Sequence, residues 1–408
     1  MNTISTPKRI CIDDVPNEIL ADIFRWVSIS SANSLSTQNG LYASEVLSQV
    51  CSLWRKLAHG SPKLWTELIL KVNVDTNSLN RRESLTHWFS RSRAVDIVLT
   101  LDPFRVGMQL QSVISTVCDH SNLWRRFRLS LPWAGIMSFF LIGTLCTPQL
   151  EELVVECVHS NSPAGLYPRH LAVKEGSERT VITDCGRLRK VCVALLPSFP
   201  LELLCNLLPW SGLTEVIIQK PGAHPTLIHH VFMHCKSLVR LKIWTAYWRL
   251  LDISMEPSDE LRLEHLESFE VEADLRALVH ILRSVQLPAL KSLTLSGIAN
   301  HDEELYPVQP SLAVALMELG DHAHFDLVEL KICGLLDFCK TSGLQLEDLL
   351  RFLASHRGLT SLALKCRRRE DAHGLLNSLS TGFLDEGNGR LAMLPKLTTI
   401  DVDGDWKE

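Results

Sequence analysis

The sequence predicts an α/β protein, in which a short N-terminal helical module precedes a right-handed solenoid built on a parallel sheet. Two observations indicate this fold class. Residues 12–65 hold apolar side chains at helical spacing, and from residue 150 onward a strand-like pattern, Leu-x-x-φ-x-φ with φ apolar, recurs between helix-like segments. Successive copies of the pattern start 24 to 38 residues apart, which is the spacing of stacked repeats.

The first predicted element is a helix that begins near Pro16. Proline suits the first turn of a helix, where its missing N–H leaves no hydrogen bond unmade. Glu18 lies near the same helix end and favours it electrostatically. An apolar stripe follows at spacings of three and four residues, and it consists of Ile19, Leu20, Ile23, Phe24 and Val27. After a polar insert at residues 28–42, a second helical stretch is predicted from Leu47, Val50, Cys51, Trp54, Leu57 and Ala58.

This segment resembles an F-box, the helical module that attaches substrate receptors to the Skp adaptor of cullin-type ubiquitin ligases. The resemblance rests on Val15-Pro16-x-Glu18-Ile19-Leu20-x-x-Ile23-Phe24, on Val50-Cys51-x-x-Trp54-x-x-Leu57-Ala58 and on Pro62-x-Leu64-Trp65. It covers residues 12–65, after an N-terminal tail at residues 1–11, and the insert departs from the compact form of the module. The resemblance implies that the adaptor is bound by Pro16, Ile19, Leu20, Ile23, Phe24, Val50, Trp54 and Leu57. The alternative is an ordinary two-helix cap on a larger domain.

The remainder, residues 66–408, is predicted to alternate strands and helices. The strands cover residues 150–156, 188–194, 213–219, 238–244, 266–272, 290–296, 327–333, 359–365 and 397–403, with looser copies at 95–101 and 123–131. The helices cover residues 201–210, 226–235, 275–285, 312–319 and 346–354. In each strand the opening Leu and both φ residues face the core, because side chains alternate along a strand. Parallel strands joined through helices require right-handed crossovers.

These copies resemble the irregular leucine-rich repeats of F-box proteins. The asparagine or cysteine that regular repeats carry after each strand is replaced, for instance by Val158 and Leu196. The resemblance implies a non-catalytic substrate receptor in ubiquitin-dependent protein degradation, which binds the Skp adaptor, through it a cullin, and an unknown protein client by protein–protein interaction. The alternative fold is a large α/β domain whose strands happen to start with leucine.

Composition narrows the function classes. A hydrophobic share of 46% and a charged share of 21% suit a globular protein, and a net charge of −5 gives no footprint for nucleic acid. The twelve cysteines are scattered along the sequence and include no Cys-x-x-Cys pair. The N-terminal residues lack the apolar core of a signal peptide. We therefore expect a cytoplasmic or nuclear protein.

The uncharged run at residues 131–148 requires a test as a membrane span, because Arg125, Arg126 and Arg128 precede it. A span needs about 20 apolar residues, and this run contains Pro132 and Gly143. A buried helix from about Ile136 to Cys146 is the favoured interpretation, and no membrane contact is expected.

The open face of the repeats is the expected client site. Its strongest candidate patch is Arg240, Lys242, Trp244, Tyr247 and Trp248, since tryptophan, tyrosine and arginine supply most interface hot spots. The alternative is that Tyr247 and Trp248 fill the loop beneath one repeat.

No metal, cofactor or catalytic residue is predicted. His229, His230, His234 and Cys235 lie on one predicted helix, but no His-Glu-x-x-His arrangement accompanies them. They are interpreted as ordinary surface and core residues.

Two other functions stay open. The first is a repeat scaffold that binds proteins without any ubiquitin ligase; in it Ile19, Leu20 and Phe24 would be buried against the first repeat and would leave no apolar surface for a partner. The second is an enzyme with a site in the groove, for which a cluster of shifted titrating groups would be needed.

Overall fold

The computed structural model describes residue 12 and residues 15–32, 43–72, 78–101, 109–158, 181–194, 201–219, 225–244, 261–298, 312–323, 325–336, 346–366 and 394–404. The contacts among Cα atoms divide the chain into two units. The first unit consists of Met1–Glu152 and Val158–Arg187, and the second consists of Leu153–Cys157 and Leu188–Glu408. The predicted N-terminal tail at residues 1–11 and most of the polar insert lie outside the described residues.

The first unit begins with short helices that pack on one another. They are α1 (Asn17–Ala32), α2 (Ala43–Val50), α3 (Ser52–Gly60) and the 3₁₀ turn η2 (Pro62–Trp65). The prediction of one continuous second helix is wrong, because the chain is extended at Cys51 (φ −154°, ψ 174°). The Cys51 Sγ accepts a hydrogen bond from the Trp54 N–H at 3.4 Å. Cys51 thereby caps α3 and ends α2.

A parallel sheet follows in the same unit. Its strands β1 (Glu67–Val72), β2 (Val95–Leu101) and β3 (Trp124–Leu131) lie in chain order, joined through α4 (Ser78–Arg91), α5 (Gln109–Cys118) and the short turn η3 (Ser121–Leu123). The two looser copies predicted at 95–101 and 123–131 are thus strands, whereas β1 was not predicted. Core side chains alternate along β3, where Phe127, Leu129 and Leu131 are buried.

The predicted helix from Ile136 to Cys146 is only partly correct. The observed helix α6 (Trp133–Phe139) ends early, and β4 (Thr144–Cys146) pairs in parallel with β6 (Val181–Thr183). Gly143 has φ 106°, a left-handed backbone conformation that glycine adopts without steric cost and that interrupts a helix. Among the described residues, no helix has the length and apolar character needed to cross a membrane.

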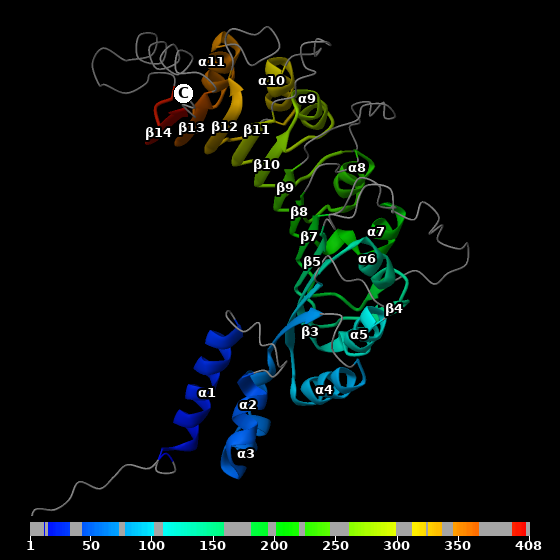
Figure 1. Ribbon diagram of the computed structural model, residues 1–408. Coiled ribbons are helices and arrows are strands. Elements are labelled where there is room, and N and C mark those ends of the chain that lie inside the picture. The colour runs from blue at the N-terminus through cyan, green and yellow to red at the C-terminus, as the bar shows by residue number, and fades with distance from the viewer. Residues whose placement is uncertain are drawn as a thin grey trace, which may run out of the picture. The chain divides into compact units, whose positions relative to one another are not determined.

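The second unit contains a large parallel sheet whose strand order, β5-β7-β8-β9-β10-β11-β12-β13-β14, follows the chain (Figure 1). The strands are β5 (Glu152–Cys157, in this unit from Leu153), β7 (Lys190–Ala194), β8 (Glu215–Ile218), β9 (Arg240–Trp244), β10 (Ser268–Ala273), β11 (Ser292–Gly297), β12 (Glu329–Leu336), β13 (Ser361–Cys366) and β14 (Thr399–Gly404). The connecting helices are α7 (Leu201–Leu207), α8 (Pro225–His234), α9 (Leu275–Arg283), α10 (Leu312–Ala323) and α11 (Leu346–Ser355), with the 3₁₀ turn η4 (Trp210–Gly212) after α7.

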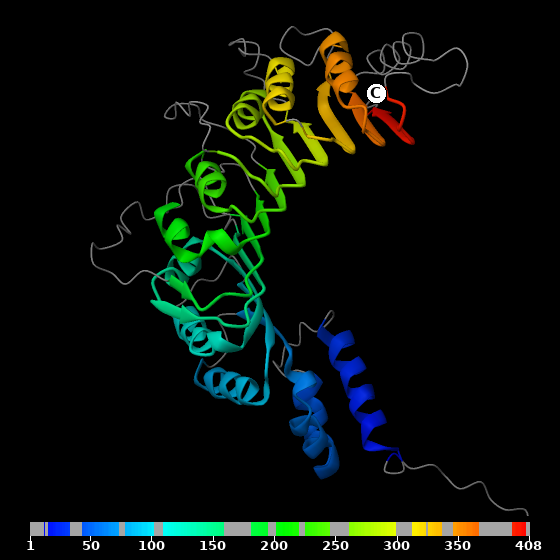
Figure 2. The same ribbon diagram turned by 180° about the vertical axis from the view of Figure 1, so that it is seen from behind.

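The helices α7 to α11 cover one face of this sheet, and the view from behind in Figure 2 agrees with Figure 1. The opposite face, which these helices leave uncovered, is called the open face below. The predicted core pattern holds in β5 and in β7 through β13. At β9, for example, Leu241 and Ile243 of the strand and Leu238 just before it are buried, while Lys242 lies on the open face.

The last strand departs from this pattern. Ile400 occupies a predicted core position of β14, yet 43% of its surface is exposed. In the strand order β14 is terminal, so it has a paired neighbour, β13, on one side alone. A terminal strand receives packing from fewer elements, and its apolar side chains are buried less completely.

A close backbone approach joins β11 to β12. The register of β12 against β13 shifts between Cys333 and Leu336, and Gly334 within this irregularity has φ 67°. A Cβ atom on Gly334 would lie 3.0 Å from the carbonyl oxygen of Gly297. Glycine is therefore required at position 334 by both the backbone angle and the available space.

Candidate interaction sites

The N-terminal helices have a small core of their own. Leu20 and Phe24, which point to the same side of α1, are each 1% exposed. The Phe24 ring packs on the Trp54 ring with 4.7 Å between centroids. Leu47 of α2, Ala58 of α3 and Leu64 of η2 are buried as well. Leu20 and Phe24 therefore pack the module itself, and their predicted contact with the adaptor stays a prediction.

The other side of α1 is apolar and exposed. Ile19 and Ile23 are 51% and 47% exposed, and Trp26 and Val27 continue the same face at helical spacing, with Trp26 72% exposed. We call these four residues the α1 outer face. On α2, Val46 and Val50 lie four residues apart and are also exposed. Exposed apolar side chains grouped along one helix face are typical of a protein-binding surface.

The remaining predicted adaptor residues differ in their exposure. Pro16 is exposed, and its carbonyl oxygen accepts the hydrogen bond of the Leu20 N–H at 3.0 Å, so Pro16 precedes the first helical residue. Trp54 and Leu57 are half-buried. Sequence reasoning missed Trp26, although its position seven residues after Ile19 is a helical-face signal. It missed Val46 for a different reason, because the second helix was placed too late.

The end of the N-terminal module is fixed to α4 through two tryptophans. Trp65 is 2% exposed and donates its Nε1–H to the Ala58 carbonyl oxygen at 2.9 Å. Trp88 of α4 meets the Trp65 ring edge-on at 4.8 Å between centroids, and its Nε1 donates to the Trp65 carbonyl oxygen at 3.1 Å. The Arg91 guanidinium lies 5.1 Å from the centre of the Trp65 ring. Trp65 thus connects α3 to α4.

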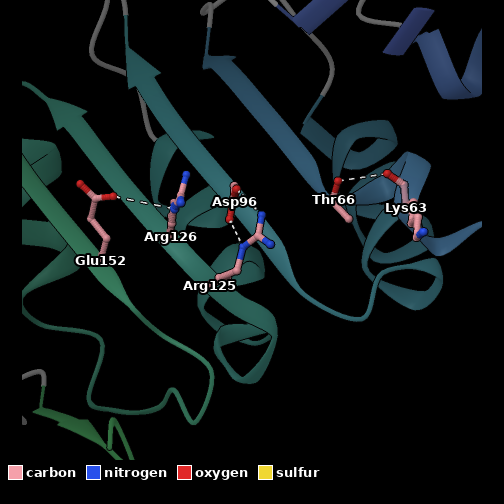
Figure 3. Close-up of polar contacts among 6 residues, drawn as sticks. All are labelled: Lys63, Thr66, Asp96, Arg125, Arg126 and Glu152. Carbon is pink, nitrogen blue, oxygen red and sulfur yellow. Dashed lines mark hydrogen bonds and ion pairs between the residues drawn. The ribbon is translucent and has the colours of Figure 1, made fainter. Parts of the chain in front are cut away.

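Charged groups on β2 and β3 neutralise one another. Figure 3 shows Arg125 directed at Asp96, with hydrogen bonds of 2.8 and 2.6 Å from its Nε and Nη2. The hydrogen bond with Asp96 raises the pKa of the Arg125 guanidinium. Arg126 lies 3.9 Å from the Glu152 carboxylate in the same view. Since each of these cations already has a carboxylate partner, this region is not a candidate anion site.

The open face of the second unit carries the predicted client patch. Arg240 and Lys190 both lie close to the Glu215 carboxylate, at 3.5 and 3.2 Å. Lys242 makes a 2.7 Å ion pair with Glu270. Trp244 is exposed at the end of β9. Tyr247 and Trp248, which completed the predicted patch, lie outside the described residues.

The histidines of α8 pack as aromatic side chains. The rings of His230 and His234 are 4.3 Å apart, and the Trp210 ring meets His230 at 5.3 Å. Burial lowers the pKa of His230 to about 4, with smaller contributions from the charges of His234 and His229. In the part of the chain that the structure describes, no group of three or more histidine, cysteine or acidic side chains is arranged to hold a metal ion.

The fold and these surfaces define a class of protein, in which a small helical module with an exposed apolar face precedes parallel β/α units. Residues 12–71 match the F-box-like family model, so the predicted F-box resemblance is confirmed and the chain carries an F-box-like domain. F-box domains in general bind adaptor proteins of the Skp type. The leucine-rich repeats stay a prediction. No curated protein matches the chain.

Proposed function

We propose that this chain is the substrate-recognition subunit of a Skp–cullin–F-box type ubiquitin ligase. In this proposal the N-terminal helices bind the Skp adaptor and, through it, a cullin, while the second unit binds a protein client. The observation that carries the proposal is the α1 outer face within a segment that matches the F-box-like family. This face keeps Ile19 and Ile23 exposed although Leu20 and Phe24 of the same helix are fully buried.

The packing of α1 supports docking by a preformed surface. Phe24 and Trp54 hold one side of the helix in place, so little further ordering is required when a partner covers the other side. Burying apolar surface contributes about 25 cal/mol per Å². Full coverage of an isoleucine side chain is therefore worth about 1.5–3 kcal/mol, and several such side chains are grouped on this face.

The second unit would act by holding the client rather than by chemistry. We propose that its strands and helices form a right-handed leucine-rich-repeat solenoid, and that its open face receives the client. The regular burial of each opening leucine and both φ residues in β5 and β7 through β13 supports this assignment. Transfer of ubiquitin would be performed by partner enzymes, and this chain would contribute proximity, which lowers the entropic part of the barrier.

The setting that fits this function is the cytoplasm, the nucleus or both. The nine cysteines whose side chains the structure describes are free thiols, and several of them are buried. A chain with free, buried thiols suits a reducing compartment. The measurement is the distribution of the tagged full-length chain between cytoplasmic and nuclear fractions.

The test is binding of a purified Skp adaptor to the full chain, measured by isothermal titration calorimetry. We expect Ile23→Asp to weaken binding at least about a hundredfold, because a buried, unpaired carboxylate is costly. Val314→Asp is the matched control, since Val314 is also an exposed apolar residue on a helix, α10, in the second unit. Circular dichroism confirms that both variants fold. Equal affinity of the Ile23 variant and the intact chain, or no binding by the intact chain, would refute the proposal.

The scaffold without a ligase role makes a different prediction for the same helix. This alternative predicts that Ile19, Leu20 and Phe24 are all buried against the first repeat. Leu20 and Phe24 are buried, and the Phe24 ring packs on Trp54 of the same module. Ile19 is half exposed. The scaffold would be favoured if the adaptor did not bind the folded intact chain.

A further inference from the structure

Most charged side chains along β7 to β10 on the open face are already paired. Lys190 and Arg240 share the Glu215 carboxylate, and Lys242 pairs with Glu270. These contacts join neighbouring strands, because Glu215 lies opposite Arg240, and Lys242 opposite Glu270, in the parallel registers. An incoming client carboxylate would have to compete with these existing partners.

Two side chains one step further along the same strands are different. Trp244 on β9 lies opposite Glu272 on β10. The indole of Trp244 is 43% exposed and makes no ring contact with another described residue. The Glu272 side chain is half-buried and forms no ion pair or hydrogen bond with another described side chain. Side chains opposite each other in adjacent strands lie within direct reach of one ligand group.

An exposed indole beside a carboxylate that has no ion pair among the described residues is suited to a cation. The π-face of tryptophan attracts lysine and arginine electrostatically, most strongly when water is displaced. The Glu272 carboxylate supplies the opposite charge, and the guanidinium of arginine can at once stack on the ring and donate to the oxygens. An acidic or phosphorylated side chain would meet repulsion from Glu272 in the same place.

We propose that Trp244 and Glu272 form a subsite for a basic side chain, arginine or lysine, of an extended segment of the protein client. This inference rests on the proposed function and specifies the chemistry of its client. It also revises the sequence-based patch: Arg240 and Lys242 line the approach as paired groups, and Glu272, which the sequence did not single out, provides the charge.

The test selects peptides without knowing the client. Random dodecapeptides displayed on phage are selected in parallel on the full chain alone and on the full chain with the Skp adaptor, and the enriched peptides are synthesised with a fluorescent label. Affinities are measured by fluorescence anisotropy for the intact chain, Trp244→Ala and Glu272→Gln. Glu329→Gln is the matched control, because Glu329 is another carboxylate on the open face, located on β12. Trp244 and Glu329 are exposed and Glu272 is half-buried, and thermal melting verifies that each of the three variants folds.

We expect enriched peptides to share an arginine or lysine. Trp244→Ala should weaken their binding about tenfold, Glu272→Gln about fivefold, and Glu329→Gln should leave it unchanged. Replacing the shared arginine by citrulline, or the lysine by acetyl-lysine, should abolish the difference between the intact chain and Glu272→Gln. Enrichment of acidic or apolar peptides, of no peptide, or of basic peptides insensitive to Trp244→Ala would overturn the inference.

Adaptor binding separates this inference from the proposed function. If the intact chain binds the adaptor but no peptide depends on Trp244, the subsite is refuted and the ligase role stands. If the chain alone, without adaptor binding, selects basic peptides that depend on Trp244 and Glu272, the ligase role is refuted and the subsite stands.

Discussion

Replacement of Trp65 provides a quantitative test of how the N-terminal module is attached to α4. Trp65 is almost fully buried, donates to the Ala58 carbonyl oxygen and packs edge-on against Trp88. Trp65→Ala removes the ring, the aromatic contact and the hydrogen bond together. We expect a loss of about 3–5 kcal/mol in the free energy of unfolding, as for other buried tryptophans.

Trp65→Phe divides this loss into its parts. Phenylalanine keeps an aromatic ring against Trp88 but cannot donate to the Ala58 carbonyl oxygen. That oxygen also accepts from the Ser61 N–H at 3.4 Å, so it is not left without any partner. We therefore expect a loss of about 1–2 kcal/mol, which is one net hydrogen bond plus a small cavity.

The assay is urea unfolding of the full chain, in which unfolding is monitored by hydrogen exchange in the peptides that contain α3 and α4. With a slope of about 2 kcal/mol per M, Trp65→Ala should lower the midpoint by about 2 M. Trp26→Ala is the matched control, since the same side chain is largely exposed on α1, and its cost should stay below about 0.5 kcal/mol. Equal midpoints for the Trp65→Ala and Trp26→Ala variants would refute this account of the junction.

Three further predictions concern the second unit. Asp274→Ala removes the carboxylate that accepts from the Ala277 N–H at 2.9 Å at the start of α9 and should cost about 1–2 kcal/mol in thermal unfolding; an unchanged melting temperature would contradict it. Gly334→Ala should lower the free energy of unfolding by at least about 1–2 kcal/mol, because position 334 has a positive φ. Gly358→Ala should lower it less, since an added Cβ there would make only ordinary van der Waals contact. The reverse order in urea titrations would contradict the backbone argument. The pKa of His230, about 4 when folded, is below its unfolded value of about 6.5. As the pH falls, His230 is therefore protonated in the unfolded chain at a higher pH than in the folded chain. The free energy of unfolding should fall as the pH drops from about 6.5 toward 4. His230→Gln should flatten that fall in urea midpoints at pH 7 and 5, and an identical slope would exclude His230 as a cause.

The strands were predictable because their pattern is short and repeated. In the copy that starts at Leu213, for example, the opening leucine, Val216 and Ile218 are all buried, as the two-residue period requires. The strands nevertheless begin two residues after each opening leucine, here at Glu215. The leucine belongs to the preceding turn, and sequence spacing alone does not distinguish a buried turn residue from a strand residue.

The N-terminal site was predictable as a segment but not as a surface. The stripe of α1 combines residues from two sides of the helix, and only packing decides that Phe24 faces Trp54 while Ile23 faces outward. The break at Cys51 was missed because cysteine is a weak hydrogen-bond acceptor and an uncommon helix cap. In the second unit, Glu272 was expected on the open face but was not included in the candidate client patch, because the sequence does not show which neighbouring charges are paired.

The order of strands in the second unit has a consequence for biosynthesis. Each of β8 through β14 pairs with the strand that immediately precedes it in the chain. Nascent polypeptide leaving the ribosome can therefore add one strand at a time to an existing edge, without waiting for distant sequence. A premature stop codon after β11 would remove later additions and leave every earlier pairing intact.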